Sequence, residues 1–146
     1  MKPKKGMLLR LAALAALTTV SLGIASPSHA AVTVTRNCST SAQMCIHYNT
    51  ISYGLNAEFG SNTNISSFNY NLNGSVYYRY KAGTQGSGGA GQTVWNNGGS
   101  GKNLSTWRNF AVFQNSNYQG NSVAIPYNHV ANLGIVQNDN ASMGWI

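Results

Sequence analysis

The feature that most constrains this chain is a repeated alternation of short apolar runs with turn-forming residues. Beyond residue 30, β-branched and aromatic runs are interrupted roughly every eight to twelve residues by Asn, Gly and Ser. No stretch of this region repeats apolar residues with the period of about 3.6 that an amphipathic helix requires. This rhythm is typical of a sandwich or barrel, so we expect an all-β fold.

The expected strands are short and are spread along the whole of this region. They are Val32 to Thr35, Met44 to Tyr48, Leu55 to Phe59, Ser75 to Lys81, Gln92 to Trp95, Phe110 to Gln114, Ser122 to Ile125 and Met143 to Ile146. Because side chains alternate across a strand, we expect Tyr78 and Tyr80 on one face. Tyr77 and Arg79 should then lie on the other face of the same strand.

Residues 1–30 have the composition of an export signal. A basic start precedes an apolar run from Leu11 to Ala25, and small residues precede a cleavage position after Ala30. The apolar run is too short to cross a bilayer, so we expect no membrane span. The sequence therefore predicts a signal peptide over 1–30, a mature chain over 31–146, and a secreted, extracellular protein.

The mature chain carries few charges. The full sequence has a formal net charge of +7, but four of its nine basic residues lie in the signal segment. The five remaining cations and the two carboxylates are scattered along the chain: Arg36, Arg79, Lys81, Lys102, Arg108, Glu58 and Asp139. Since no basic run is present to release counterions from a phosphate backbone, nucleic acid is not an expected partner.

Cys38 and Cys45 are the only cysteines in the sequence. An exported pair in an oxidising compartment is more often a disulfide than a metal site. We therefore expect a short Cys38–Cys45 bridge, which restrains the unfolded chain by about 2–3 kcal/mol. Intermolecular pairing and free thiols are the alternatives.

A weak internal repeat indicates a doubled architecture. Tyr48 and Tyr53 have the same spacing as Phe113 and Tyr118 in the second half of the chain. This alignment places the two aromatic pairs at equivalent positions, Tyr48 matching Phe113.

The repeat also divides the mature chain. We expect a single domain over 31–146, with a first motif over about 38–100 and a second over about 108–146. Near the end of each half stands a tryptophan, Trp95 or Trp145. We expect these two rings to fill equivalent places in the two half-cores.

The run from Phe113 to Ser122 resembles the signature of a βγ-crystallin Greek key. It has an aromatic residue at each of two positions, the second being Tyr118, then a glycine at Gly120 and a serine. In that family the rings form a corner over a folded hairpin, and the glycine takes a backbone conformation that a side chain would forbid. The resemblance implies a βγ-crystallin-like sandwich of two Greek-key motifs. In the first half, Leu55 stands where the hairpin glycine would be, with Gly54 one place away.

A loop near the C-terminus resembles the calcium loop of the same family, which begins with two Asn or Asp residues and closes with Ser or Thr. Here it contains Asn138, Asp139 and Ser142, but Met143 stands where calcium-binding members have a second serine. The corresponding loop of the first half, placed near Gly89 to Thr93, lacks the pair. The resemblance implies at most one weak calcium site, with a structural Asx turn as the alternative, and no other cofactor.

The N-terminal cysteine spacing, followed by an aromatic hairpin and the Asn-Asp-Asn-Ala-Ser loop, resembles bacterial secreted proteins of the Streptomyces metalloproteinase inhibitor family. This resemblance implies a peptidase inhibitor that binds an extracellular metalloprotease non-covalently. The long polar loop from Asn96 to Arg108 is the expected contact, with Asn103, Trp107 and Arg108 as the candidate residues. A solvated connection between strands is the alternative.

We do not expect an enzyme. Only His47, His129, Glu58 and Asp139 are available for acid–base chemistry in the mature chain, and no nucleophile-elbow or zinc-binding spacing frames them. The alternatives to an inhibitor are a module that binds cell-wall or fungal-wall polysaccharide, in the manner of crystallin-like killer toxins, and a structural envelope protein. Trp107 is the free candidate for stacking on a sugar.

Overall fold

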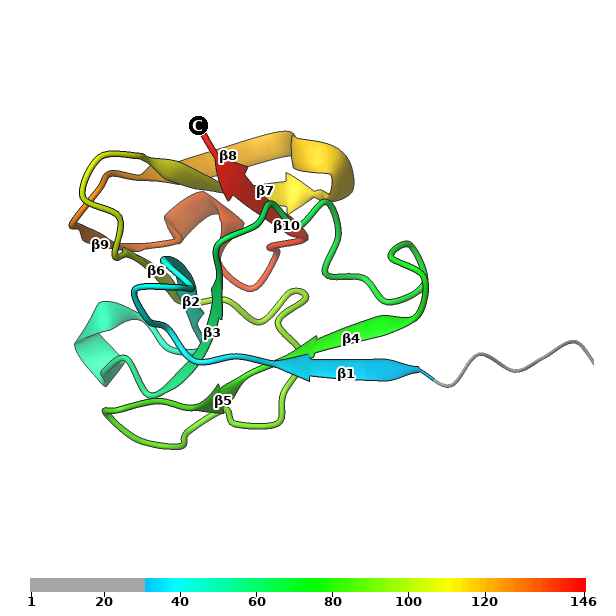
Figure 1. Cartoon of the computed structure of the whole chain (residues 1–146), viewed down its shortest axis with the longest axis horizontal. Helices are drawn as coiled ribbons and strands as arrows, with labels where there is room; N and C mark the ends of the chain where they lie inside the picture. The colour runs from blue at the N-terminus through cyan, green and yellow to red at the C-terminus, as the bar shows by residue number, and fades with distance from the viewer. Residues whose placement is uncertain (1–30) are drawn as a thin grey trace, which may run out of the picture.

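A computed structural model describes residues 31–146 of the chain; the expected signal peptide lies outside the described residues. This part of the chain forms β-strands and short 3-10 turns, with no α-helix (Figure 1). The strands are β1 (Val32–Thr35), β2 (Met44–His47), β3 (Ala57–Ser61), β4 (Val76–Arg79), β5 (Lys81–Ala82), β6 (Ser100–Asn103), β7 (Phe110–Asn115), β8 (Gln119–Ile125), β9 (Val130–Asn132) and β10 (Ser142–Trp145). The all-β expectation is confirmed.

Two antiparallel sheets enclose the core. The larger has the strand order β5-β3-β2-β6-β9, and the smaller has the order β10-β7-β8. Met44 and Ile46 of β2 belong with Phe110 and Val112 of β7 to one buried apolar cluster. In Figure 1 the strands of the smaller sheet lie together in the upper part of the view, while β1 and β4 run side by side, as a parallel pair, in the lower part.

Each half of the chain gives one strand segment to the sheet of the other half. Strand β9, from the second half, pairs with β6 of the first. In return, Ile65 of the first half forms a bridge with Met143 of β10. The two Greek keys therefore interlock, and β6 carries the first motif to Asn103.

Reciprocal hydrogen bonds identify the equivalent loops of the two motifs. The Asn96 N–H donates to the Asn140 carbonyl at 2.9 Å, and the Asn138 N–H donates to the Gly98 carbonyl at 2.9 Å. Asn96 and Asn138 also share a left-handed φ of 54°. The first-half counterpart of the Asn138 loop therefore begins at Asn96 and ends at Ser100. The expectation that it lies near Gly89 to Thr93 is wrong.

The hairpins of the two motifs align one residue away from the expected register. His47 pairs with Ser100 as Phe113 pairs with Ser142, so His47 corresponds to Phe113. Tyr48 is therefore not the equivalent of Phe113; its ring packs edge-on against another tyrosine of the core instead.

The same one-residue correction identifies the hairpin glycine of the first motif. Gly54 and Gly120 have left-handed φ values of 83° and 77°. Gly54, not Leu55, therefore has the role that the family resemblance assigns to glycine. The edge-on ring pair of the hairpin is present in the second motif, where Phe113 and Tyr118 lie 5.7 Å apart.

Two strands were not expected, and one expected strand is absent. The segment from Gln92 to Trp95 forms only an isolated bridge, between Thr93 and Arg79. Strands β6 and β9 carry little apolar patterning. β6 is nevertheless an inner strand, between β2 and β9, and the Ile125 side chain of the smaller sheet lies close over its glycine, Gly101. The two tryptophans do not occupy equivalent positions, contrary to expectation. When β10 is aligned with β6, Trp145 corresponds to Asn103 and not to Trp95. Both rings are partly buried against the core.

Among residues 31–146, no helix has the length and apolarity needed to cross a membrane. The expected disulfide is present between Cys38 and Cys45, whose Cα atoms lie 5.6 Å apart. It ties the segment before β2 to β2 itself.

Candidate functional site

The connection between β6 and β7 is shorter and more ordered than the sequence suggests. Of the expected loop from Asn96 to Arg108, residues Ser100–Asn103 form β6. Asn103 is only 1% exposed, so it does not contact a partner. Its Nδ2 donates to the carbonyls of Arg108, at 2.8 Å, and Ile125, at 3.0 Å. Asn103 is therefore an internal brace of this loop.

A serine completes the bracing. The Ser105 hydroxyl accepts hydrogen bonds from the N–H groups of Trp107, at 3.3 Å, and Arg108, at 3.1 Å. Ser105 is itself held, because its own N–H donates to Asn103 Oδ1 at 2.9 Å. The backbone of the turn is thus fixed by hydrogen bonds that do not involve a partner.

The braced turn presents an aromatic and a cationic side chain. Trp107 is 72% exposed. The Arg108 guanidinium lies 5.0 Å from the centre of the Trp107 ring and 4.8 Å from that of Trp145, within cation–π range of both. The loop, seen in Figure 1 as the yellow-green connection between β6 and β7, therefore offers a rigid surface centred on Trp107.

A second candidate site is a shallow groove beside β4, with a volume of about 260 Å³. Its lining includes Tyr70, Tyr77, Arg79, Gln92 and Trp95. The rings of Tyr70 and Tyr77 stack at 4.5 Å with an interplanar angle of 20°, and Arg79 lies 5.2 Å from the centre of the Tyr77 ring. Stacked rings beside polar side chains suit an uncharged ligand that has both apolar and hydroxylated faces.

The alternation of side chains between the two faces of β4 explains which of its residues line this groove. Tyr78 and Tyr80 pack with the core, and Tyr77 and Arg79 line the groove on the opposite face, as predicted. Trp95 could not be grouped with these residues from the sequence, because the segments that carry them meet only in the folded chain.

The Asn138 loop is held by hydrogen bonds of its own. The Ser142 hydroxyl donates to the Asn115 carbonyl at 2.6 Å and accepts from the Tyr118 N–H at 3.1 Å. Asp139 Oδ2 accepts a hydrogen bond from Gln114 Nε2 at 2.6 Å. The residues expected to bind calcium thus connect the last strand to the neighbouring hairpin.

Comparison with known proteins identifies the fold but no relative in sequence. No family model matches this chain, and no curated protein matches it. A solved structure described as "Evolution of the eye lens beta-gamma-crystallin domain fold" is similar to it, with a TM-score of 0.51 and 10% sequence identity. The similarity covers 77% of this chain and 92% of that chain. The chain has a βγ-crystallin fold.

Calcium fits the loops of this βγ-crystallin fold poorly. Ca²⁺ takes six to eight oxygen ligands, usually with several carboxylates. Asp139 is the one carboxylate of the second loop, and the first loop, from Asn96 to Ser100, has none. The hydroxyl of Ser142 is already engaged with the hairpin. A weak calcium site remains a prediction.

Proposed function

We propose that this protein is a secreted, non-catalytic inhibitor of an extracellular metallopeptidase, and that it binds through the loop between β6 and β7. The observation that carries the proposal is an exposed Trp107 on a backbone held by Asn103 and Ser105. A rigid loop loses little conformational entropy when it enters a cleft, so more of the contact energy remains as affinity. Tryptophan and arginine are also the residues most enriched at energetic centres of interfaces.

The metallopeptidase class is favoured by the resemblance of the cysteine spacing and the Asn-Asp-Asn-Ala-Ser loop to the metalloproteinase inhibitors. Non-covalent action follows from the loop itself, whose side chains supply the exposed ring of Trp107 and the half-buried cation of Arg108. Of the four acid–base residues, His47 and Glu58 lie together but are only 2% and 5% exposed, whereas His129 is exposed. A pair that is buried away from any substrate supports binding over catalysis.

The proposal predicts that the Trp107→Ala variant inhibits at least about thirtyfold more weakly than the wild type, the loss of about 2 kcal/mol expected at a hot spot. Protein purified from the culture medium after expression of the full chain is titrated against a thermolysin-type metallopeptidase and, in parallel, against a serine peptidase. The inhibition constant is read from residual peptidase activity.

The Tyr53→Ala variant is the matched control, because Tyr53 is an exposed ring, 79% accessible, on a different loop. It should inhibit as the wild type does. If the wild type causes no loss of metallopeptidase activity at micromolar excess, the inhibitor proposal is wrong.

A second function, binding of a wall polysaccharide, is favoured by the groove of Tyr77, Arg79 and Trp95. Aromatic rings can stack on the apolar face of a sugar while neighbouring polar groups bond its hydroxyls. At about 260 Å³ the groove has room for a single sugar unit rather than for a long chain segment. The expected affinity for one unit is therefore low.

The test is retention on insoluble chitin and on peptidoglycan. Tyr77→Ala should at least halve the fraction retained, because the ring forms the stacking surface, whereas Trp107→Ala should leave it unchanged. The same two variants thus separate the two functions, each serving as the control for the other. Equal retention of the wild type and Tyr77→Ala would exclude the groove.

A further inference from the structure

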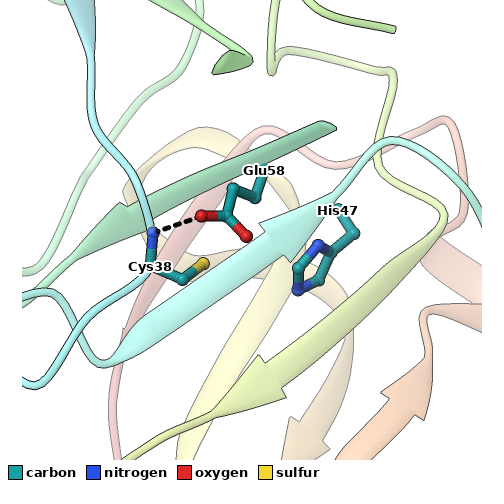
Figure 2. A group of neighbouring side chains, drawn as sticks. All are labelled: Cys38, His47 and Glu58. Carbon is teal, nitrogen blue, oxygen red and sulfur yellow. Dashed lines mark hydrogen bonds between the residues drawn. The ribbon is translucent and has the colours of Figure 1, made fainter. Parts of the chain in front are cut away.

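The outer face of the larger sheet carries a cluster of potential metal ligands. Within the described residues, the sulfur of Cys38, a ring nitrogen of His47 and a carboxylate oxygen of Glu58 lie within 4.8 Å of one another. Figure 2 shows these three side chains gathered beside β2 and β3. Cys45, the disulfide partner of Cys38, adds a second sulfur one bond away.

Among residues 31–146, the ring of the cluster's histidine has no hydrogen-bond partner. His47 is 2% exposed, and neither ring nitrogen has a hydrogen bond within the described part of the chain. A buried polar atom without a partner costs about 1–3 kcal/mol, so such atoms are rare, and a bound ion is one of the few causes that explain them. The second motif has Phe113 at the equivalent position. An apolar ring would therefore be compatible with the fold, yet the first motif has a base.

Hydrogen bonds within the protein already hold the carboxylate of Glu58 in one orientation. Glu58 is 5% exposed, and its Oε1 accepts hydrogen bonds from Asn37 Nδ2 and from the Cys38 N–H, both at 3.0 Å. The second of these is the dashed line in Figure 2. Outer hydrogen bonds of this kind fix the orientation of metal-binding carboxylates in known sites.

We propose that this cluster is a latent zinc site that forms when the Cys38–Cys45 disulfide is reduced. The ligands would be the two thiolates, one ring nitrogen of His47 and one oxygen of Glu58. Two sulfurs, an imidazole and a carboxylate around a four-coordinate ion are the donor set of Zn²⁺. The proposal does not depend on the peptidase or polysaccharide function.

The geometry requires only a local adjustment. With Zn–S of about 2.3 Å and Zn–N or Zn–O of about 2.0–2.2 Å, neighbouring donors of a tetrahedral site lie roughly 3.3–3.8 Å apart. The donors of Cys38, His47 and Glu58 already lie within 4.8 Å. After reduction, the two sulfurs must move apart to this separation. Cys45 is fixed in β2, whereas Cys38 lies outside the strands, so the Cys38 side chain is the one that must rotate.

A dithiol is the reductant that opens the Cys38–Cys45 disulfide. The dithiol gives two electrons to the protein disulfide, becomes a disulfide itself, and leaves Cys38 and Cys45 as two thiols. Zn²⁺ then displaces two protons from these thiols and forms two Zn–S bonds. Because the same sulfurs serve either the disulfide or the metal, the oxidised protein cannot hold zinc in this way.

The test uses the full chain, expressed and purified from the culture medium, in oxidised and in reduced form. Zinc affinity is measured by competition with a chromogenic chelator, and Co²⁺ serves as the spectroscopic probe. The reduced wild type should bind one zinc per chain at least about a hundredfold more tightly than the oxidised protein. Its Co²⁺ complex should show a thiolate-to-metal charge-transfer band and the visible bands of tetrahedral coordination.

The ligand variants define the site. His47→Gln and Glu58→Gln should each weaken zinc binding at least about tenfold in the reduced state. His129→Gln should bind as the wild type does, since His129 is the exposed histidine of the mature chain. Zinc should also raise the Tm of the reduced wild type and leave that of the oxidised protein unchanged.

Several results would overturn the proposal. Zinc binding by His47→Gln as tight as that of the wild type would show that the two thiols act alone. A reduced chain that stays unfolded in the presence of zinc, or binds no zinc at one per chain, would also contradict it. If neither ligand variant folds, X-ray absorption at the zinc edge of the wild-type complex decides: two sulfur and two nitrogen or oxygen ligands support the site, and any other set excludes it.

Discussion

The Asn140→Ala variant is expected to have a free energy of unfolding about 3 kcal/mol lower than that of the wild type. Asn140 is fully buried where the two motifs meet; its Oδ1 accepts a hydrogen bond from the Gly98 N–H at 2.6 Å, and its Nδ2 donates to the Val94 carbonyl at 2.8 Å. Alanine would leave the Gly98 N–H buried without a partner, at a cost of about 1–3 kcal/mol, and the Val94 carbonyl would keep only a long hydrogen bond from the Asn97 N–H, at 3.4 Å, losing about 0.5–1.5 kcal/mol more. Urea denaturation followed by tryptophan fluorescence measures the change as a lower midpoint at an unchanged m-value.

A matched control is available among the many asparagines. The Asn71 side chain is exposed, so Asn71→Ala should change the free energy of unfolding by no more than about 0.5 kcal/mol. In thermal unfolding, Asn140→Ala should lower the Tm by about 10 °C. A loss of less than about 1 kcal/mol for Asn140→Ala would show that the Gly98 N–H finds another partner, and the prediction would be wrong.

The same residue explains why the two loops differ in sequence. Gly98 and Asn140 occupy equivalent positions and face each other across the junction of the motifs. A Cβ at Gly98 would lie 2.8 Å from Asn140 Oδ1 and 2.8 Å from Leu133 Cδ1. Only one of the two equivalent positions can therefore carry a side chain. Duplication of a motif leads here to asymmetry, because the junction has room for one amide.

The sequence was sufficient for the fold class because its strongest signals are local. The Phe113 to Ser122 hairpin carries its own determinants: two rings that pack on each other, and a glycine, Gly120, with a left-handed φ of 77°. The alternation of Tyr77 and Arg79 with two core tyrosines is likewise readable from a strand alone. The disulfide followed from the compartment that the export signal implies.

The register of the first motif could not be predicted, because its hairpin has lost the aromatic pair. His47 stands at the position that Phe113 has in the second motif. The nearest aromatic residue, Tyr48, was therefore aligned with Phe113, one residue away from the correct register. Strand β6 was missed for a different reason. Its sequence, Ser-Gly-Lys-Asn, has no apolar residue, and the core side chain over it comes from Ile125 of another strand.

In the candidate site, too, the sequence predicts the role of one residue but not that of its neighbour. Trp107 was correctly expected to be exposed, because it stands among polar turn residues. Asn103 was expected beside it as a contact, but the side chain points inward and holds the loop. An asparagine that binds a partner and one that braces a turn look alike in sequence, since both stand in a polar run. Only the position of Ile125, which accepts one of its hydrogen bonds, distinguishes them.

Acidification of the oxidised protein, with metal chelated, should reduce its stability by up to about 3 kcal/mol between pH 6.5 and pH 4. Burial of His47, and then the positive charge of Lys102, lower the pKa of this imidazole from 6.5 to about 4. In this interval the unfolded chain binds a proton at His47 and the folded chain does not, so protons favour unfolding. The stability is fully present above pH 6.5 and is lost as the pH falls to 4.

The neighbours of His47 limit the size of this effect and make the measurement clean. Lys102 of β6 opposes protonation, whereas the carboxylate of Glu58 on β3 favours it and offsets part of the loss, so about 3 kcal/mol is an upper bound. Only two carboxylate side chains, Glu58 and Asp139, follow residue 30. Carboxylates therefore add little to the loss of stability at low pH. Urea midpoints from pH 7 to pH 4 should therefore fall steeply for the wild type and for His129→Gln, but much less for His47→Gln. A slope that persists in His47→Gln would assign the titration to another group, and a flat wild-type profile would mean that His47 accepts a proton within the fold.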